Sequence, residues 1–162
     1  MRRLIGCICL ILLLVAPLSF EYTGQRQIFS LFQYTGYEER SVIFSQNETV
    51  VYHAIYNVFY KMFNNPCETI VFLTWQGTLY VYTNQMADRV TAPIGVVNAD
   101  LQSQGQELAD VILVVHNHFA CPVFSPRDIR SYYYLKNKGF TGVFALWDSA
   151  QNRMVNRLPV KK

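Results

Sequence analysis

The sequence predicts an α/β (α+β) domain, and three observations support this fold class. Residues 109–115 form a short, β-branched and continuously apolar run, which is typical of a buried strand. Residues 50–63 carry apolar side chains at helical spacing. The chain has 162 residues, of which 51% are hydrophobic, and it contains no repeat, linker or low-complexity tract. It is therefore long enough to bury one substantial core.

The amino end, residues 1–20, predicts export. Arg2 and Arg3 form a basic start, and residues 4–20 are almost entirely apolar but a little short for a membrane span. A secretory signal is the leading interpretation, which predicts a periplasmic or secreted protein. Pro17 interrupts the small-residue pattern of a cleavage site, so an uncleaved anchor is the alternative, and any membrane contact is expected through this segment alone.

The next segment, residues 21–46, is rich in aromatic residues and shows no clear period. We expect it to form an extra strand or to cover the sheet of the main domain, residues 47–162. His53 lies in the helical pattern of residues 50–63, and we expect it to be a packed or surface helix residue.

Two of the three histidines, His116 and His118, stand at the carboxyl end of the predicted strand 109–115. Because strand side chains alternate with a period of two, both rings point the same way. A loop with Pro122 follows. Ser125 then suits the N-cap of a helix, with proline after it, so that Asp128 lies in the first helical turn and can reach back toward the histidines.

Two imidazoles and a carboxylate are the ligands that catalytic zinc takes when it keeps one position open. Each part also has a plain structural explanation. Ser-x-x-Asp is a common helix cap, and alternate strand residues often share a face. The coincidence of strand end, loop and helix start favours a metal site at His116, His118 and Asp128.

This constellation resembles the JAB/MPN (JAMM) zinc metalloprotease family, whose signature is an upstream Glu, His-x-His, seven residues and Ser-x-x-Asp. The spelling His116-Asn117-His118 is closest to the RadC-like branch. The resemblance covers about residues 48–158 and implies a cytidine-deaminase-like JAB/MPN fold, with a central mixed β-sheet flanked by helices. The implied elements are a helix at 48–64, strands from 68 and at 78–82, a short helix at 101–108, the histidine strand, the helix at Asp128, and strands at 142–147 and 153–158.

The resemblance also implies a chemistry. His116, His118 and Asp128 would hold Zn²⁺, Glu68 would be the general base for the attacking water, and Ser125 would hydrogen-bond the oxyanion or that water. The substrate would be a protein or peptide, cut at a peptide or isopeptide bond. Glu68 also has a plain alternative, an exposed residue at a strand edge. The other acidic residues between Glu68 and His116 fall in less suitable places: Asp88, Asp100, Glu107 and Asp110.

One spacing departs from the family pattern. Six residues separate His118 from Ser125, where the pattern has seven, and Phe119 stands where many relatives carry proline. Such a deletion is usually absorbed by the turn, but a displaced ligand would impair activity.

The mature chain would keep two cysteines, Cys67 and Cys121, since Cys7 and Cys9 lie in the signal-like segment. The family arrangement would bring Cys67 and Cys121 near one another, and a disulfide between them would brace the short loop. The alternative is two unrelated thiols.

Three functional classes follow. The first is an exported zinc hydrolase of peptide or isopeptide bonds, the second a non-catalytic JAB-like binding module, and the third a RadC-like DNA-associated protein. The net charge of +3 is mild and the basic residues are scattered, so we expect no nucleic-acid partner.

Overall fold

The computed structural model describes residues 25–30, 58–64, 66–84 and 90–158. The amino-terminal segment 1–20, His53 and most of the helix expected at 48–64 lie outside these ranges; residues 58–63 of that helix are helical. The strands are β1 (Gln25–Ser30), β2 (Thr69–Thr74), β3 (Thr78–Thr83), β4 (Val111–His118), β5 (Val143–Asp148) and β6 (Arg153–Leu158). The longer helices are α4 (Ile94–Ser103) and α5 (Pro126–Asn137), and Leu108–Asp110 form one 3₁₀ turn.

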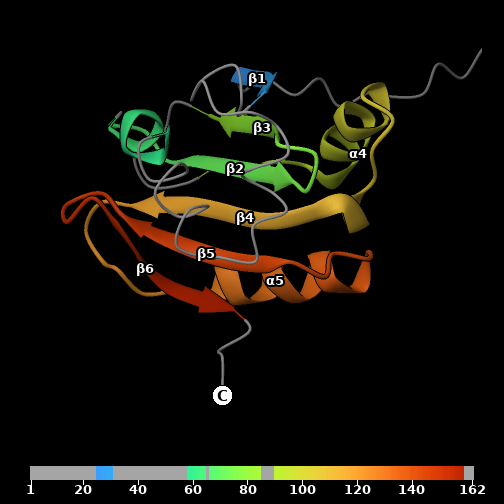
Figure 1. Ribbon diagram of the computed structural model, residues 1–162. Coiled ribbons are helices and arrows are strands. Elements are labelled where there is room, and N and C mark those ends of the chain that lie inside the picture. The colour runs from blue at the N-terminus through green and yellow to red at the C-terminus, as the bar shows by residue number, and fades with distance from the viewer. Residues whose placement is uncertain (1–24, 31–57, 65, 85–89, 159–162) are drawn as a thin grey trace, which may run out of the picture.

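The strands form one mixed sheet with the order β1-β3-β2-β4-β5-β6 (Figure 1). Only the β4–β5 pair is parallel within this sheet, and α5 makes the crossover between these two strands. A parallel pair needs such a crossover because the chain must return to the same edge before the second strand begins. The sheet and its helices confirm the predicted α/β class and the mixed sheet.

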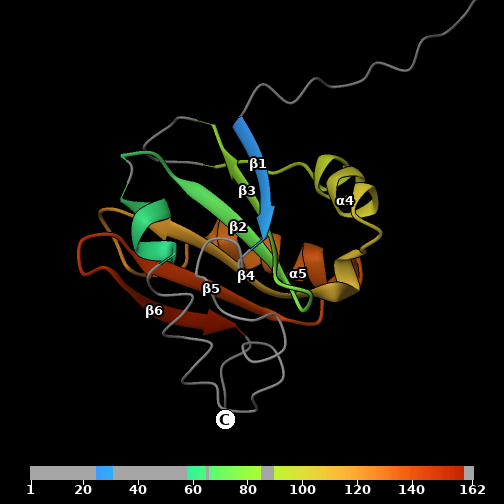
Figure 2. The same cartoon turned by 45° about the horizontal axis from the view of Figure 1, so that its top comes forward.

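Each face of the sheet buries its own hydrophobic core, because successive strand residues point to opposite faces. The 58–63 helix covers one face, and Figure 2 shows it on the opposite side of the sheet from α5. Helices α4 and α5 cover the other face. The first core contains Phe59, Phe63, Val71, Leu73, Leu79, Val81, Leu113, Val115, Ala145 and Trp147. The second contains Phe72, Tyr80, Tyr82, Val97, Leu101, Val111, Val114, Tyr132, Leu135, Phe140 and Phe144.

This alternation positions the histidines. Val114 belongs to the core under α4 and α5, so His116 and His118, two and four residues further along β4, point to the same face. Asn117 points to the face that the 58–63 helix covers. Strand β4 lies between β2 and β5 and is not an edge strand. The two histidines at its carboxyl end therefore have a neighbouring strand on each side.

The strands agree with the sequence better than the helices do. Strand β1 confirms an extra strand in residues 21–46, and it pairs with β3. The prediction of a helix at 101–108 is wrong, because α4 begins at Ile94 and ends at Ser103. Gly105 adopts φ +67° there, and its amide and that of Gln106 donate to the carbonyls of Gln102 and Leu101, which is a Schellman stop. No helix among the described residues is long and apolar enough to cross a membrane.

Gly142 provides a test of the packing of β4 against β5. A methyl group at this position would overlap the backbone carbonyl oxygen of Ile112 and lie 2.6 Å from the carbonyl oxygen of Val111. We expect Gly142→Ala to lower the free energy of unfolding by about 1–3 kcal/mol, the usual cost of overpacking.

The matched control is Gly95→Ala in α4, where an added methyl group meets nothing within 4 Å. It should raise the free energy of unfolding by about 0.5–1 kcal/mol, because alanine favours helix more than glycine does. Urea unfolding of the two variants measures both values. Equal stability of the two variants would contradict the close approach at Gly142.

Candidate metal centre

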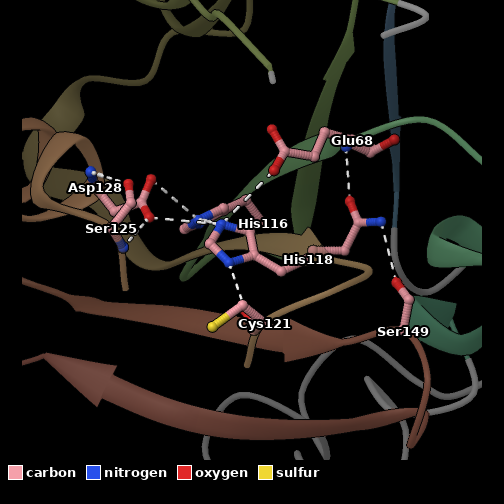
Figure 3. Close-up of polar contacts among 9 residues, drawn as sticks. Glu68, His116, His118, Cys121, Ser125, Asp128 and Ser149 are labelled. Carbon is pink, nitrogen blue, oxygen red and sulfur yellow. Dashed lines mark hydrogen bonds and ion pairs between the residues drawn. The ribbon is translucent and has the colours of Figure 1, made fainter. Parts of the chain in front are cut away.

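Four of the predicted site residues line one cavity of about 330 Å³. Figure 3 shows their side chains pointing toward one another. His116 and His118 come from β4, Glu68 precedes β2, and Asp128 lies in the first turn of α5. Ser125 also lines this cavity. The structure thus brings together every residue that the sequence predicted for the site.

The candidate metal-ligand atoms of three residues lie close together. The Nε2 atoms of His116 and His118 lie 3.1 Å apart, Asp128 Oδ1 lies 3.3 Å from His116 Nε2, and Asp128 Oδ2 lies 3.5 Å from His118 Nε2. In a tetrahedral zinc site with bonds of about 2.0–2.1 Å, two ligand atoms are about 3.3 Å apart. The three residues can therefore hold a metal ion between them with little rearrangement.

A backbone contact orients the ring of His118. Its Nδ1 lies 3.0 Å from the carbonyl oxygen of Cys121, which can only accept a hydrogen bond. Nδ1 therefore donates to this carbonyl, and Nε2 is directed toward Asp128 and His116. Metal-binding histidines in proteins are usually held by such a second hydrogen bond, which fixes both the tautomer and the ring orientation.

The ring of His116 is held by packing instead. It lies 5.4 Å from the ring of Phe144 and 6.1 Å from that of Phe124, measured between centroids. Its buried Nδ1 has no hydrogen-bond partner in the part of the chain that the structure describes. An unsatisfied buried nitrogen is costly, and among the described residues this ring is oriented by packing and not by a second hydrogen bond.

Asp128 is fixed by the start of α5. Ser125 is the N-cap: its hydroxyl oxygen accepts from the Asp128 amide at 3.2 Å, and Asp128 Oδ2 accepts from the Ser125 amide at 2.7 Å. Pro126 occupies the first helical position. The capping box predicted from the sequence is therefore present, and the capping carboxylate is also the third candidate ligand.

The protonation states suit metal binding, which needs neutral imidazole and ionised carboxylate. Burial lowers the pKa of His116 below its usual value, and this outweighs the opposing effect of Asp128. Burial alone would raise the pKa of Asp128, but contacts with His116 and with Ser125 outweigh it and hold that pKa well below its usual range. Both groups are thus in ligand form at neutral pH.

Glu68 lies beside the three candidate ligands because of strand register. Ile70 of β2 pairs with His116 of β4 in antiparallel orientation, and the same register continued by two residues brings Glu68 opposite His118. Its Oε1 lies 3.6 Å from His118 Nε2, and the residue is 9% exposed. Glu68 is therefore not the exposed edge residue of the alternative interpretation.

The short loop between His118 and Ser125 is held by hydrogen bonds. Cys121 bonds His118 through its carbonyl, and the Asn156 side chain of β6 donates to the carbonyl of Pro122. Cys67 and Cys121 are free thiols in the structure, so the expected disulfide does not brace this loop. Six residues are enough to bring Asp128 to both histidines.

Sequence reasoning missed the part played by Asn117. This residue is fully buried on the opposite face of β4, where its Oδ1 accepts from the Thr69 amide at 2.7 Å and its Nδ2 donates to Ser149 Oγ at 3.1 Å. The side chain thus attaches the start of β2, next to Glu68, to β4. The available signal was its position between two histidines, since strand alternation directs Asn117 to the face opposite theirs.

Comparisons of the chain with protein families, with curated proteins and with solved structures found no significant match.

The Asn117 contact predicts a local weakening. In Asn117→Ala the buried amide of Thr69 loses its acceptor, so we expect the free energy of unfolding to fall by about 1–3 kcal/mol. Amide hydrogen exchange at Thr69 should accelerate more than at the centre of β2. Ser149→Ala removes only the second hydrogen bond and is the control, with little change at Thr69. Equal exchange at Thr69 in both variants would contradict this assignment.

Proposed function

We propose that this protein is a zinc-dependent hydrolase of peptide or isopeptide bonds. The observation that carries the proposal is the contact of Glu68 with His118, 3.6 Å from Oε1 to Nε2, beside three groups that can hold a metal ion. Two neutral imidazoles and one carboxylate are the ligand set of hydrolytic zinc sites with three protein ligands. A second carboxylate that does not bind the metal, such as that of Glu68, is what such sites use as a base.

The proposal gives each side chain one task. His116, His118 and Asp128 hold the zinc ion, which supplies Lewis acidity toward the scissile carbonyl and makes water more acidic when it is bound. The Glu68 carboxylate takes a proton from the attacking water and passes it to the nitrogen of the leaving amine. The carbon–nitrogen bond breaks, water oxygen bonds to the carbonyl carbon, and the products are a carboxylate and an amine.

Ser125 is in place for a second role. Its hydroxyl oxygen accepts from the Asp128 amide, which leaves the hydroxyl hydrogen to donate elsewhere, and the residue lines the cavity. In the proposed reaction it donates to the oxygen on which negative charge develops. One such donor is worth about 10²–10³ in kcat in hydrolases that have been tested by substitution.

Metal content is the first test. The full chain should contain about one zinc ion, measured by elemental mass spectrometry at neutral pH, and both His118→Gln and Asp128→Asn should lose it, since each removes one of three protein ligands. His53→Ala, which alters the third histidine, is the control and should keep the metal. Folded protein without zinc would sink the proposal.

The base is tested separately. Glu68→Gln should keep zinc but lower kcat by about 10²–10⁴ on a peptide substrate, the usual contribution of a general base. Glu107→Gln is the control, because Glu107 is an exposed residue before the 3₁₀ turn, outside the cavity. If zinc is present and Glu68→Gln has no effect on a measurable activity, the base assignment is wrong. Zinc without any activity would favour a binding module.

A further inference from the structure

A second cavity, of about 420 Å³, adjoins the candidate metal centre. The two cavities share five lining residues, so they form one continuous depression in the surface. Its volume lies within the range of sites that bind small molecules or peptide side chains. The shared residues are Ile70, Val90, Arg127, Ser131 and Phe144.

The floor of the second cavity is apolar. It consists of Ile70 and Phe72 from β2 and Phe144 from β5, and Leu135 of α5 adds a further apolar side chain. These residues belong to the core under α4 and α5 or pack against it. A large apolar side chain placed on this floor would leave water, which favours its binding there.

One face of α5 forms a wall with a basic rim. The lining residues of this helix follow the spacing i, i+3, i+4, i+7 and i+8, which marks a single helical face: Arg127, Arg130, Ser131, Tyr134 and Leu135. Asp128 lies about 100° around the helix from Arg127 and points to the histidines. The same helical turn thus directs a carboxylate into the first cavity and a guanidinium to the boundary between the two cavities.

Neither arginine has an acidic partner within the residues that the structure describes. Arg127 has one long contact, 3.5 Å from Nη2 to Thr91 Oγ1, and no ion pair of the described residues includes Arg130. The first cavity is lined by the carboxylates of Glu68 and Asp128, and Arg127 lies where it adjoins the second cavity. A substrate carboxylate would be attracted to the rim of the second cavity, which carries both arginines and, among the described residues, no acidic lining residue.

We propose that the second cavity is a specificity site for a large apolar side chain followed by a carboxylate, the carboxylate being bound by Arg127 and Arg130. This inference rests on the proposed function, because it places the substrate amide in the adjoining cavity with Glu68. The preferred substrate is then a peptide with an acidic residue directly after a bulky apolar one. Arginine suits this role because its guanidinium forms forked hydrogen bonds with carboxylates.

The test uses fluorescence anisotropy with the full chain carrying Glu68→Gln, so that bound peptide is not cut. The probes are labelled peptides with blocked ends that differ at one position: phenylalanine is followed by glutamate in the first and by lysine in the second. We expect the glutamate peptide to bind about tenfold more tightly, as expected for charge-assisted hydrogen bonds. Replacing the phenylalanine of the first peptide by alanine should weaken its binding by about tenfold.

A charge swap identifies the residue. Adding Arg130→Glu should reverse the preference, so that the lysine peptide binds more tightly. The matched control is Lys136→Glu, which makes the same change in net charge on α5 but lies outside both cavities. The Lys136→Glu variant should still bind the glutamate peptide more tightly than the lysine peptide. Equal affinities for the two peptides, a preference unchanged by Arg130→Glu, or no binding of either peptide would each overturn the proposed specificity site.

Zinc content and hydrolysis, measured for the corresponding chains with Glu68 intact, separate this inference from the proposed function. Zinc and hydrolysis together with charge-independent binding overturn the specificity site and leave the hydrolase proposal standing. Charge-dependent binding that Arg130→Glu reverses, in protein without zinc, supports the site as a peptide-binding site and overturns the hydrolase proposal.

Discussion

The register of β4 between β2 and β5 is the constraint on which the candidate site depends. Pairing of Ile70 with His116 brings Glu68 opposite His118, and strand alternation directs all three of these polar side chains to the face under α5. A slip by one residue would turn both histidines to the other face and bring Asn117 into the cavity. The hydrophobic residues of β4, which fill two separate cores, make that slip costly.

The polar groups at this strand end are tolerated because nearly all of them have partners. Asn117 provides the acceptor that the Thr69 amide needs, Cys121 accepts from His118, and Ser125 shares two hydrogen bonds with Asp128. The Nδ1 atom of His116 is an exception. Its burial without a hydrogen-bond partner among the described residues lowers the stability of this region.

Much of this arrangement could be predicted from the sequence, because it depends on local rules. The period of two in β4 and the Ser125 cap of α5 are readable from neighbouring residues, and β6 matches its expected bounds, Arg153–Leu158. The start of α4 was missed because no capping side chain marks it, since Pro93 precedes the helix. The role of Asn117 could not be predicted, because its partners Thr69 and Ser149 are distant in sequence and meet only through the sheet.

Helix α5 shows how a short segment can serve two adjoining cavities. Its cap fixes Asp128 toward the histidines, and the angle of about 100° between successive helical residues places Arg127 at the junction of the two cavities. No ion pair of the described residues joins these two opposite charges, although they are neighbours in the chain. Asp128 remains available to a cation, and Arg127 together with Arg130 remains available to an anion. Under the proposed function, the two charges would orient a substrate that carries a carboxylate near its scissile amide before the reaction begins.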